Sequence, residues 1–100
     1  MDLVILYGPE IGRTLLINEG VSYLGRWLDN DIRIEDKTVS QNHLKLETDR
    51  GKLFVTDLGS RNETFCTGKF MIPGNEVEVK EGAPLAIGMT VICFGEGCKE

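Results

Sequence analysis

Residues 32–57 read IRIEDKTVSQNHLKLETDRGKLFVTD, and their hydrophobic pattern decides the fold class. Apolar and charged residues alternate in Ile32–Glu35 and in Leu44–Glu47, as they do in strands that bury one face. Leu53–Val55 is a continuous apolar run, which is typical of a strand that is covered more completely. The turn signal Asp49-Arg50-Gly51 separates the last two segments. The stretch therefore predicts successive short strands joined by turns.

The same pattern continues in both directions along the chain. Further strands are expected at Leu3–Tyr7, Leu15–Ile17, Val21–Leu24, Val77–Lys80 and Val91–Phe94. No window of ten or more residues has the apolar spacing of an amphipathic helix. Short strands with turn signals at close intervals predict an all-β fold, an antiparallel sandwich or barrel with essentially no helix. The last strand is expected beside the first, which would bring the two termini together.

Length and charge exclude several classes of protein. One hundred residues with 41% hydrophobic and 27% charged content predict one globular domain over residues 1–100, too small for a cofactor domain beside catalytic machinery. The net charge of −5 argues against binding to nucleic acid or to an anionic membrane. The longest mostly apolar stretch, Leu85–Phe94, is half the roughly 20 residues that span a bilayer. The N-terminus has no basic region before its apolar run, so a secretory signal is not expected.

The cysteines predict neither a metal site nor a disulfide. Cys66, Cys93 and Cys98 are odd in number and lack C-x-x-C spacing, and the chain has one histidine, His43. We expect no metal, no cofactor and three free thiols in a reducing cytoplasm. Cys93 is expected in the core and Cys98 at the surface.

Three expected loops carry an unusual set of hydrogen-bond donors. They contain Gly25-Arg26, Thr38–His43 and Asp57–Thr64. Together they supply two arginines, a serine hydroxyl and an asparagine amide, the donors that hold a dianionic oxyanion beside a peptide backbone. A rigid β scaffold presents binding groups on such loops.

Five motifs occur in order over residues 25–88, and together they resemble the forkhead-associated (FHA) family. They are Gly25-Arg26, Asn30-Asp31-Ile32, Val39-Ser40-x-x-His43, Asp57-Leu58-Gly59-Ser60-x-Asn62-x-Thr64 and Leu85-x-Ile87-Gly88. The resemblance implies a sandwich of about eleven strands whose loops at one end bind phosphothreonine peptides. The expected closeness of the two termini would suit a module carried by a longer protein. Its partner would be a phosphothreonine-containing protein or peptide, in trans or within its own chain, bound by a monomeric, cytoplasmic signalling module.

The resemblance also implies roles for individual residues. Arg26 and Ser40 match the family's phosphate-contacting arginine and serine, and Gln41 stands where a polar or basic side chain assists. Asn62 matches the asparagine that bonds the peptide main chain, while Arg61 faces either the phosphate or a later peptide residue. Five further residues are expected to support the binding loops: Gly25, His43, Asp57, Gly59 and Thr64.

The chain departs from the family's Asn-Gly-Thr pattern, because it reads Asn62-Glu63-Thr64. Glycine at the middle position permits a positive φ and leaves room for a ligand. Glutamate adopts a positive φ only at a cost in free energy, and its side chain takes up space. The Glu63 carboxylate would lower phosphate affinity if it pointed inward, or accept a basic peptide side chain if it pointed outward. Farther along, Thr67 replaces an asparagine that often precedes the glycine at position 68.

Other interpretations of these residues remain open from sequence. Arg26 is alternatively a surface charge paired with Asp29 or Asp31, and Ser40 a turn former. The acidic segments 29–31 and 35–36 are interpreted as a solvated rim. A degenerate module of the same fold would mediate protein assembly without phosphate.

Catalysis by a serine–histidine–carboxylate triad is also conceivable, from Ser40, His43 and Asp57. No G-x-S-x-G elbow frames the serine, however, and Ser40 lies three residues from His43 in one loop. We therefore do not expect an enzyme.

Overall fold

The computed structural model describes residues 1–98, which form eleven strands and one short 3₁₀ turn. The strands are β1 (Asp2–Tyr7), β2 (Thr14–Leu16), β3 (Gly20–Gly25), β4 (Ile32–Arg33), β5 (Leu44–Asp49), β6 (Lys52–Asp57), β7 (Thr64–Cys66), β8 (Lys69–Phe70), β9 (Glu76–Val79), β10 (Pro84–Ile87) and β11 (Thr90–Phe94). The 3₁₀ turn η1 covers Glu96–Cys98. The all-β prediction and the expected number of strands are confirmed.

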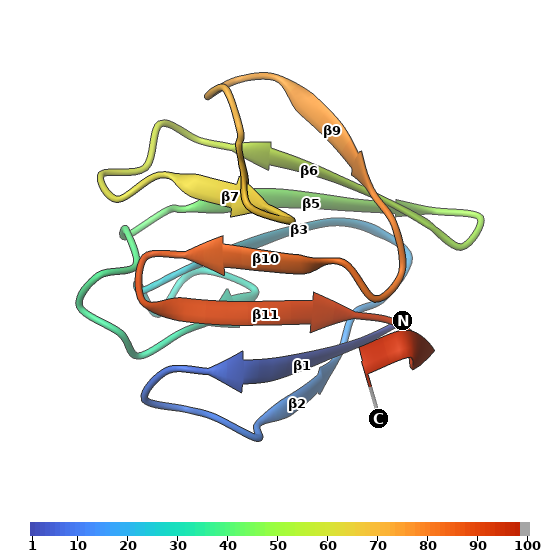
Figure 1. The fold of residues 1–100 in the computed structure, drawn as a ribbon, viewed down its shortest axis with the longest axis horizontal. Helices are drawn as coiled ribbons and strands as arrows, with labels where there is room; N and C mark the ends of the chain where they lie inside the picture. Colours follow the sequence, from blue (N-terminus) through green and yellow to red (C-terminus); the bar gives the residue numbers. More distant parts are fainter. Residues whose placement is uncertain (99–100) are drawn as a thin grey trace.

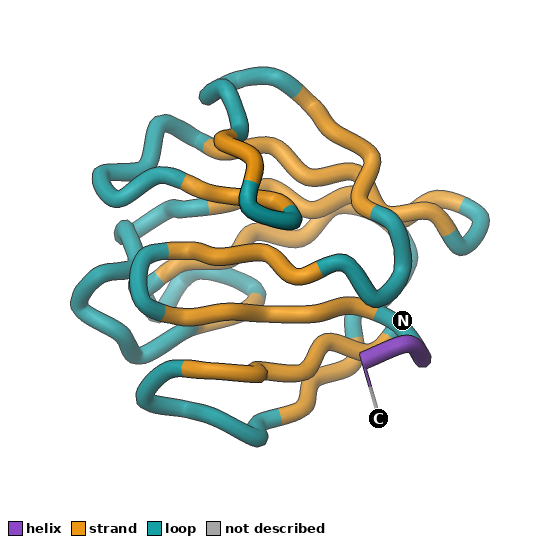
Figure 2. The backbone as a smooth tube through the Cα atoms, viewed as in Figure 1, coloured by secondary structure: helices purple, strands orange, loops and turns teal. Residues whose placement is uncertain are grey.

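The strands form two sheets that pack face to face as a sandwich (Figure 1). One sheet has the order β2-β1-β11-β10-β7-β8, and the other has the order β4-β3-β5-β6-β9. All pairs are antiparallel except β3–β4. The first and last strands are neighbours, with Leu3 opposite Phe94, so the N-terminus lies beside the turn that follows β11 (Figures 1 and 2). Among the described residues, no helix has the length and apolar character needed to cross a membrane.

Alternation along the strands builds the core. In β5, Leu44 and Leu46 are fully buried, while Lys45 and Glu47, which alternate with them on the opposite face, are half-buried. The facing sheet contributes inward side chains such as Leu85 and Ile92. β5 lies at the centre of its five-stranded sheet, between β3 and β6, and both β5 and β6 are strands, as the hydrophobic pattern predicts.

Three strands were not predicted from sequence: β7, β8 and β10. β7 and β8 are three and two residues long, too short to show a period. Their hairpin turn consists of Thr67 and Gly68, with φ of 51° and 80°. Both angles lie in the left-handed region that such two-residue turns require, which is why asparagine is preferred where this chain has threonine.

The expectation of three free thiols is wrong for two of them. Cys93 on β11 and Cys98 on η1 form a disulfide, and Cys66 is free. The turn that follows β11 folds back and brings the two Cα atoms to 5.8 Å, within the range that a disulfide spans. A separation of five residues gives no C-x-x-C signal, so the spacing rule missed the pair. The inference of a reducing compartment from free thiols therefore loses its basis.

Candidate functional site

Three loops meet at one end of the sandwich, on the left of Figure 1 and in teal in Figure 2. They join β3 to β4, β4 to β5 and β6 to β7. Between them lies a groove of about 480 Å³. Its lining consists of Arg26, Lys37, Thr38, Val39, Ser40, Gln41, Asn42, Leu58, Gly59, Arg61 and Asn62. All five residues predicted to contact a phosphopeptide line this groove.

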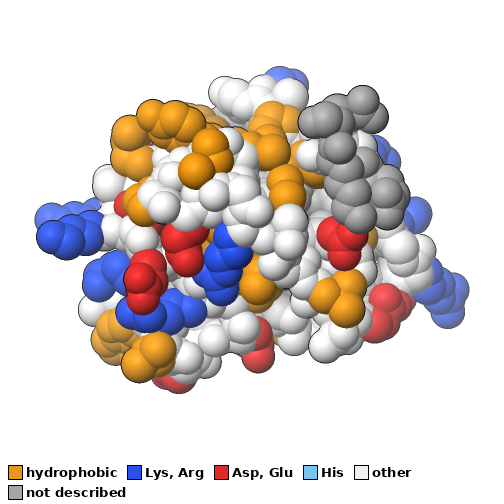
Figure 3. Space-filling view, turned by 90° about the horizontal axis from the view of Figure 1, so that it is seen from below, with side chains coloured by type: hydrophobic (Ala, Val, Ile, Leu, Met, Phe, Trp, Pro, Cys, Tyr) orange, Lys and Arg blue, Asp and Glu red, His pale blue; other side chains and the backbone are white. Residues whose placement is uncertain are grey.

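The charge of this groove differs from that of the whole chain. Its lining includes three cations, Arg26, Lys37 and Arg61, and no carboxylate. By contrast, the face seen in Figure 3 intersperses acidic and basic side chains. The net charge of −5 therefore conceals a local cationic site suited to an anion.

Lys37 is a lining residue that the sequence analysis missed. It is exposed, and no ion pair links it to a residue in the described range 1–98. Its position three residues before Ser40, inside the loop that leads to β5, was the available signal. Lys37 lies outside the five motifs, so the resemblance implies no role for it.

Arg26 is held in place by the loop opposite it. Its Nε donates to the Val39 carbonyl at 3.1 Å, and its backbone amide donates to the Ser40 carbonyl at 2.9 Å. The alternative pairing with Asp29 or Asp31 is not observed within the described residues; Asp31 instead accepts a bond from the Tyr23 amide at 2.8 Å. Fixing Nε leaves the two terminal nitrogens of the guanidinium for a ligand.

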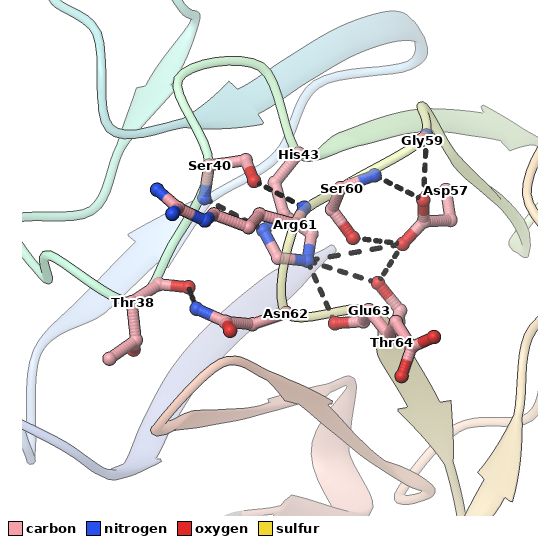
Figure 4. Close-up of polar contacts among 10 residues, drawn as sticks. All are labelled: Thr38, Ser40, His43, Asp57, Gly59, Ser60, Arg61, Asn62, Glu63 and Thr64. Atoms are coloured by element: carbon pink, nitrogen blue, oxygen red, sulfur yellow. Dashed lines mark hydrogen bonds and ion pairs between the residues drawn. The ribbon is translucent and has the colours of Figure 1, made fainter.

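The Ser40 hydroxyl connects two loops and keeps a proton to donate. Its Oγ accepts a hydrogen bond from the Arg61 amide at 2.9 Å (Figure 4). A hydroxyl that accepts in this way still has its own O–H, which is free to turn into the groove. On the far side, Asn62 Nδ2 donates to the Thr38 carbonyl at 2.7 Å. Gln41 is exposed at the groove wall.

Gly25 permits the close approach of two backbone segments beside Arg26. A Cβ at this position would lie 2.2 Å from the Gln41 carbonyl oxygen. Any larger residue would push the serine loop away from the arginine. The constraint is steric, since the φ of Gly25 is not in the left-handed region.

His43 lies fully buried beneath the groove and joins the second loop to the third. Its Nδ1 accepts a hydrogen bond from the Ser40 amide at 3.0 Å, so Nδ1 carries no proton. Nε2 therefore carries the proton and faces the Glu63 carbonyl and the Thr64 hydroxyl, both at 3.1 Å. Burial lowers the pKa of His43, against the opposing effects of the Glu63 carbonyl and the Asp57 charge. The ring is neutral at pH 7.

Asp57 organises the third loop from a fully buried position at the end of β6. Oδ1 accepts from the amides of Gly59 and Ser60 at 2.7 and 2.8 Å. Oδ2 accepts from the hydroxyls of Ser60 and Thr64, both at 2.5 Å (Figure 4). Burial alone would raise the pKa of Asp57, but these four hydrogen bonds outweigh it and hold the pKa below its ordinary value. The carboxylate stays ionised and fixes the turn.

These contacts do not form a catalytic triad. The Ser40 hydroxyl faces the Arg61 amide, and His43 Nδ1 is occupied by a backbone amide. His43 Nε2 points to the third loop and lies 4.0 Å from Asp57 Oδ2. Within residues 1–98, no base contacts the Ser40 hydroxyl, although a serine nucleophile requires such a contact.

Glu63 adopts the conformation that glycine would take in the family's pattern. Its φ is 66°, in the left-handed region. In Figure 4 its carboxylate points away from Ser40 and Arg61, and the residue does not line the groove. The side chain therefore leaves the cationic site open.

The interpretation of the acidic segments as a solvated rim is wrong for two residues. Asp36 is buried, and its carboxylate accepts bonds from the Thr38 amide at 2.9 Å and the Thr90 hydroxyl at 2.6 Å. Asn30 is also buried, and its Nδ2 donates to the Trp27 and Gln41 carbonyls. Both side chains satisfy backbone groups of the loops, which is why they face inward.

The chain is similar to a protein family and to FHA domains of known structure. The family described as "Inner membrane component of T3SS, cytoplasmic domain" matches residues 4–97. The solution structure of the FHA domain of an Arabidopsis thaliana hypothetical protein is 33% identical with a TM-score of 0.84, covering 92% of this chain and 80% of that one. An FHA domain from a study of phosphothreonine-dependent FHA interactions is 28% identical with a TM-score of 0.79, covering 92% and 91%.

A relative known by its function is the oxoglutarate dehydrogenase inhibitor of Corynebacterium jeikeium. It is 32% identical over 98 residues, which cover 98% of this chain and 66% of the relative. The chain thus spans slightly less than two thirds of that protein. The chain is thus similar to two FHA domains of known structure and to an inhibitor of an enzyme.

Proposed function

Because the chain belongs to the forkhead-associated family, we propose that it is a phosphothreonine-binding module for phosphorylation-dependent protein–protein interaction. The observation that carries the proposal is the groove in which three cations and the Ser40 hydroxyl meet without a carboxylate. The likeness to an FHA domain studied for phosphothreonine-dependent interactions supports it.

The chemistry of the groove fits the ligand. A phosphothreonine carries about −1.5 to −2 charges at pH 7, because its second pKa is about 6. Arg26 has two free terminal nitrogens with which a guanidinium meets two phosphate oxygens. In this proposal Ser40 donates its hydroxyl proton to a third oxygen. Arg61 and Lys37 add positive charge at the rim.

The remaining polar residues take roles around the phosphate. Asn62 bonds the peptide main chain, and Gln41 assists at the wall of the groove. The contacts of His43, Asp57 and Thr64 hold the Ser40 and Arg61 loops at a fixed separation. Gly25 and Gly59 allow the backbone geometry that these contacts need.

We further propose a binding role without catalysis, as a module of a longer protein. The partner is a phosphothreonine-containing protein in trans, or a phosphorylated segment of the same polypeptide. A cytoplasmic location belongs to this proposal, because the partner must have met a kinase and ATP.

A second candidate is protein assembly without phosphate, as in a degenerate module of the same fold. The observations that favour it are the match to a family described as a component of a secretion system and the glutamate at position 63. The outward direction of the Glu63 carboxylate removes one reason for assuming lost phosphate binding. The cationic groove makes the phosphate-dependent function the better supported of the two.

Titration by fluorescence anisotropy separates the two candidates. A labelled degenerate phosphothreonine library and its unphosphorylated twin are titrated with the protein. Phosphate-dependent binding is expected, with no measurable affinity for the twin. Equal binding to both libraries would contradict the proposal and favour assembly. The single tryptophan, Trp27, directly follows Arg26 and provides a label-free fluorescence signal for the same event.

A further inference from the structure

A second groove, of about 540 Å³, adjoins the phosphate groove. Arg26 and Lys37 line both of them, so the two grooves meet at these cations. Its lining includes Trp27, Leu28 and Arg33, and we call this site the Trp27 groove. It lies between the loop that joins β3 to β4 and the segment that follows β4.

The wall of the Trp27 groove exposes large apolar side chains. Trp27 is 45% exposed and Leu28 is 81% exposed. A single exposed apolar residue is ordinary, but two adjacent ones that line a groove provide a surface that gains by being covered. The loop holds them there, because the Trp27 amide and carbonyl bond to Gln41 and Asn30.

Apart from Arg26 and Lys37, the cations shared with the phosphate groove, the charged side chains of the Trp27 groove have partners within the protein. Arg33 Nη1 pairs with Glu35 at 2.5 Å, and its Nε donates to the Arg26 carbonyl at 3.1 Å. Both oxygens of the Asp36 carboxylate accept bonds, from Thr38 and Thr90. Arg33 is therefore held as a flat guanidinium whose face is suited to stacking on an apolar or aromatic group.

We propose that the Trp27 groove binds a large apolar side chain of the phosphopeptide, within about three residues of the phosphothreonine. The inference rests on the proposed function, because the phosphate groove anchors the peptide at Arg26 and Lys37. An extended peptide advances about 3.3 Å per residue, so a few residues reach an adjoining groove. Trp27 and Leu28 thereby determine sequence specificity, in addition to the phosphate contacts.

The test uses heptapeptides with a central phosphothreonine in an alanine background. Phenylalanine, leucine or aspartate is placed singly at each of the three positions on either side. We expect phenylalanine or leucine at one position to tighten binding about fivefold over alanine, the gain from partly burying a large apolar side chain. No such gain is expected from aspartate. The readout is fluorescence anisotropy with the whole chain.

Variants locate the preference. In Leu28→Ala and Trp27→Ala the preference for the apolar side chain over alanine falls to less than twofold. In the control variant Leu16→Ala, an equally simple truncation on β2 at a side chain 70% exposed, the fivefold preference remains. Circular dichroism checks that each variant is folded.

Each result distinguishes this inference from the proposed function. If no phosphopeptide binds, the proposed function fails, and this inference with it. If phosphopeptides bind without apolar preference at any position, this inference alone is overturned. It is also overturned if the preference survives in Leu28→Ala and Trp27→Ala, since another surface then provides it, or if aspartate gives the gain.

Discussion

Replacing Glu63 by glycine is predicted to stabilise the protein by about 1 kcal/mol. Glu63 has a φ of 66°, and a side chain in the left-handed region costs roughly 1–2 kcal/mol through contact of its Cβ with the backbone. Glycine removes that contact, but its unfolded chain is more flexible, which offsets about 0.5–1 kcal/mol. The Glu63 contact in the loop network is its carbonyl, which bonds to His43 at 3.1 Å and is retained in glycine. The difference between the two ranges is a gain of about 0–1.5 kcal/mol, and the predicted gain of about 1 kcal/mol lies in its upper half.

Thermal and urea unfolding measure this effect. In a domain of about 100 residues, 1 kcal/mol corresponds to a rise in Tm of about 4–8 °C. The matched control is Glu47→Gly in the middle of β5, where φ is not left-handed and glycine is expected to lower stability by about 0.5–1 kcal/mol. Phosphopeptide affinity is expected to change less than twofold in Glu63→Gly, because the carboxylate points away from the groove.

An unchanged or lower Tm in Glu63→Gly would refute the reasoning, because it would show that the left-handed backbone at this position is not strained. A rise in phosphopeptide affinity of threefold or more would contradict the conclusion that the Glu63 side chain leaves the groove open. It would place the Glu63 carboxylate near the phosphate, against the direction seen in Figure 4.

Three more predictions follow from the buried network and the ligand charge. Burial lowers the pKa of His43, so below about pH 6.5 the unfolded chain takes up a proton that the folded protein does not. The free energy of unfolding, measured by urea titration from pH 7.5 to 5.5, should therefore fall with decreasing pH by up to about 1.4 kcal/mol per pH unit. His43 is the one histidine in the chain, so a flat profile would contradict its neutral, buried state. Asp57→Ala leaves the Ser60 and Thr64 hydroxyls and two amides without their acceptor, so we expect the free energy of unfolding, measured by chemical denaturation, to fall by about 3 kcal/mol. A fall of less than about 1 kcal/mol would mean that water replaces the carboxylate as the acceptor. Phosphopeptide affinity should weaken below about pH 6, as the phosphate loses its second charge, and equal anisotropy curves at pH 7.5 and 5.5 would argue against recognition of the dianion.

The strands that show a clear hydrophobic period were predictable from sequence. β5 alternates clearly in sequence because Leu44 and Leu46 are buried on one face, and the continuous apolar run Leu53–Val55 marks β6, where Leu53 and Val55 are buried. β7 and β8 were missed, since pairing with neighbours, rather than local pattern, makes strands of Thr64–Cys66 and Lys69–Phe70. The disulfide between Cys93 and Cys98 depends on a turn that folds back after β11, which no spacing rule detects.

The candidate site was predictable where a residue carries a motif and unpredictable where its role depends on the fold. Arg26, Ser40 and Asn62 were found through their spacing, and the structure brings them to one groove. Asp36 looks like a surface acid in sequence, yet Thr38 and Thr90 satisfy it inside the loop region, and Thr90 is 54 residues away in the chain. Lys37 has no motif, and its place in the groove follows from the course of the loop.

The central claim is that Arg26 and its groove read a phosphate. The most direct test measures the affinity for a phosphothreonine peptide and for its unphosphorylated twin, in the wild type, in Arg26→Ala and in the charge control Lys52→Ala on β6. One arginine–phosphate interaction contributes roughly 1.5–3 kcal/mol, so Arg26→Ala should weaken phosphopeptide binding about 10- to 150-fold, while Lys52→Ala binds as the wild type does. Equal affinity of the wild type for the phosphorylated peptide and its unphosphorylated twin would contradict this claim. Equal affinity of the wild type and Arg26→Ala for the phosphopeptide would also contradict it.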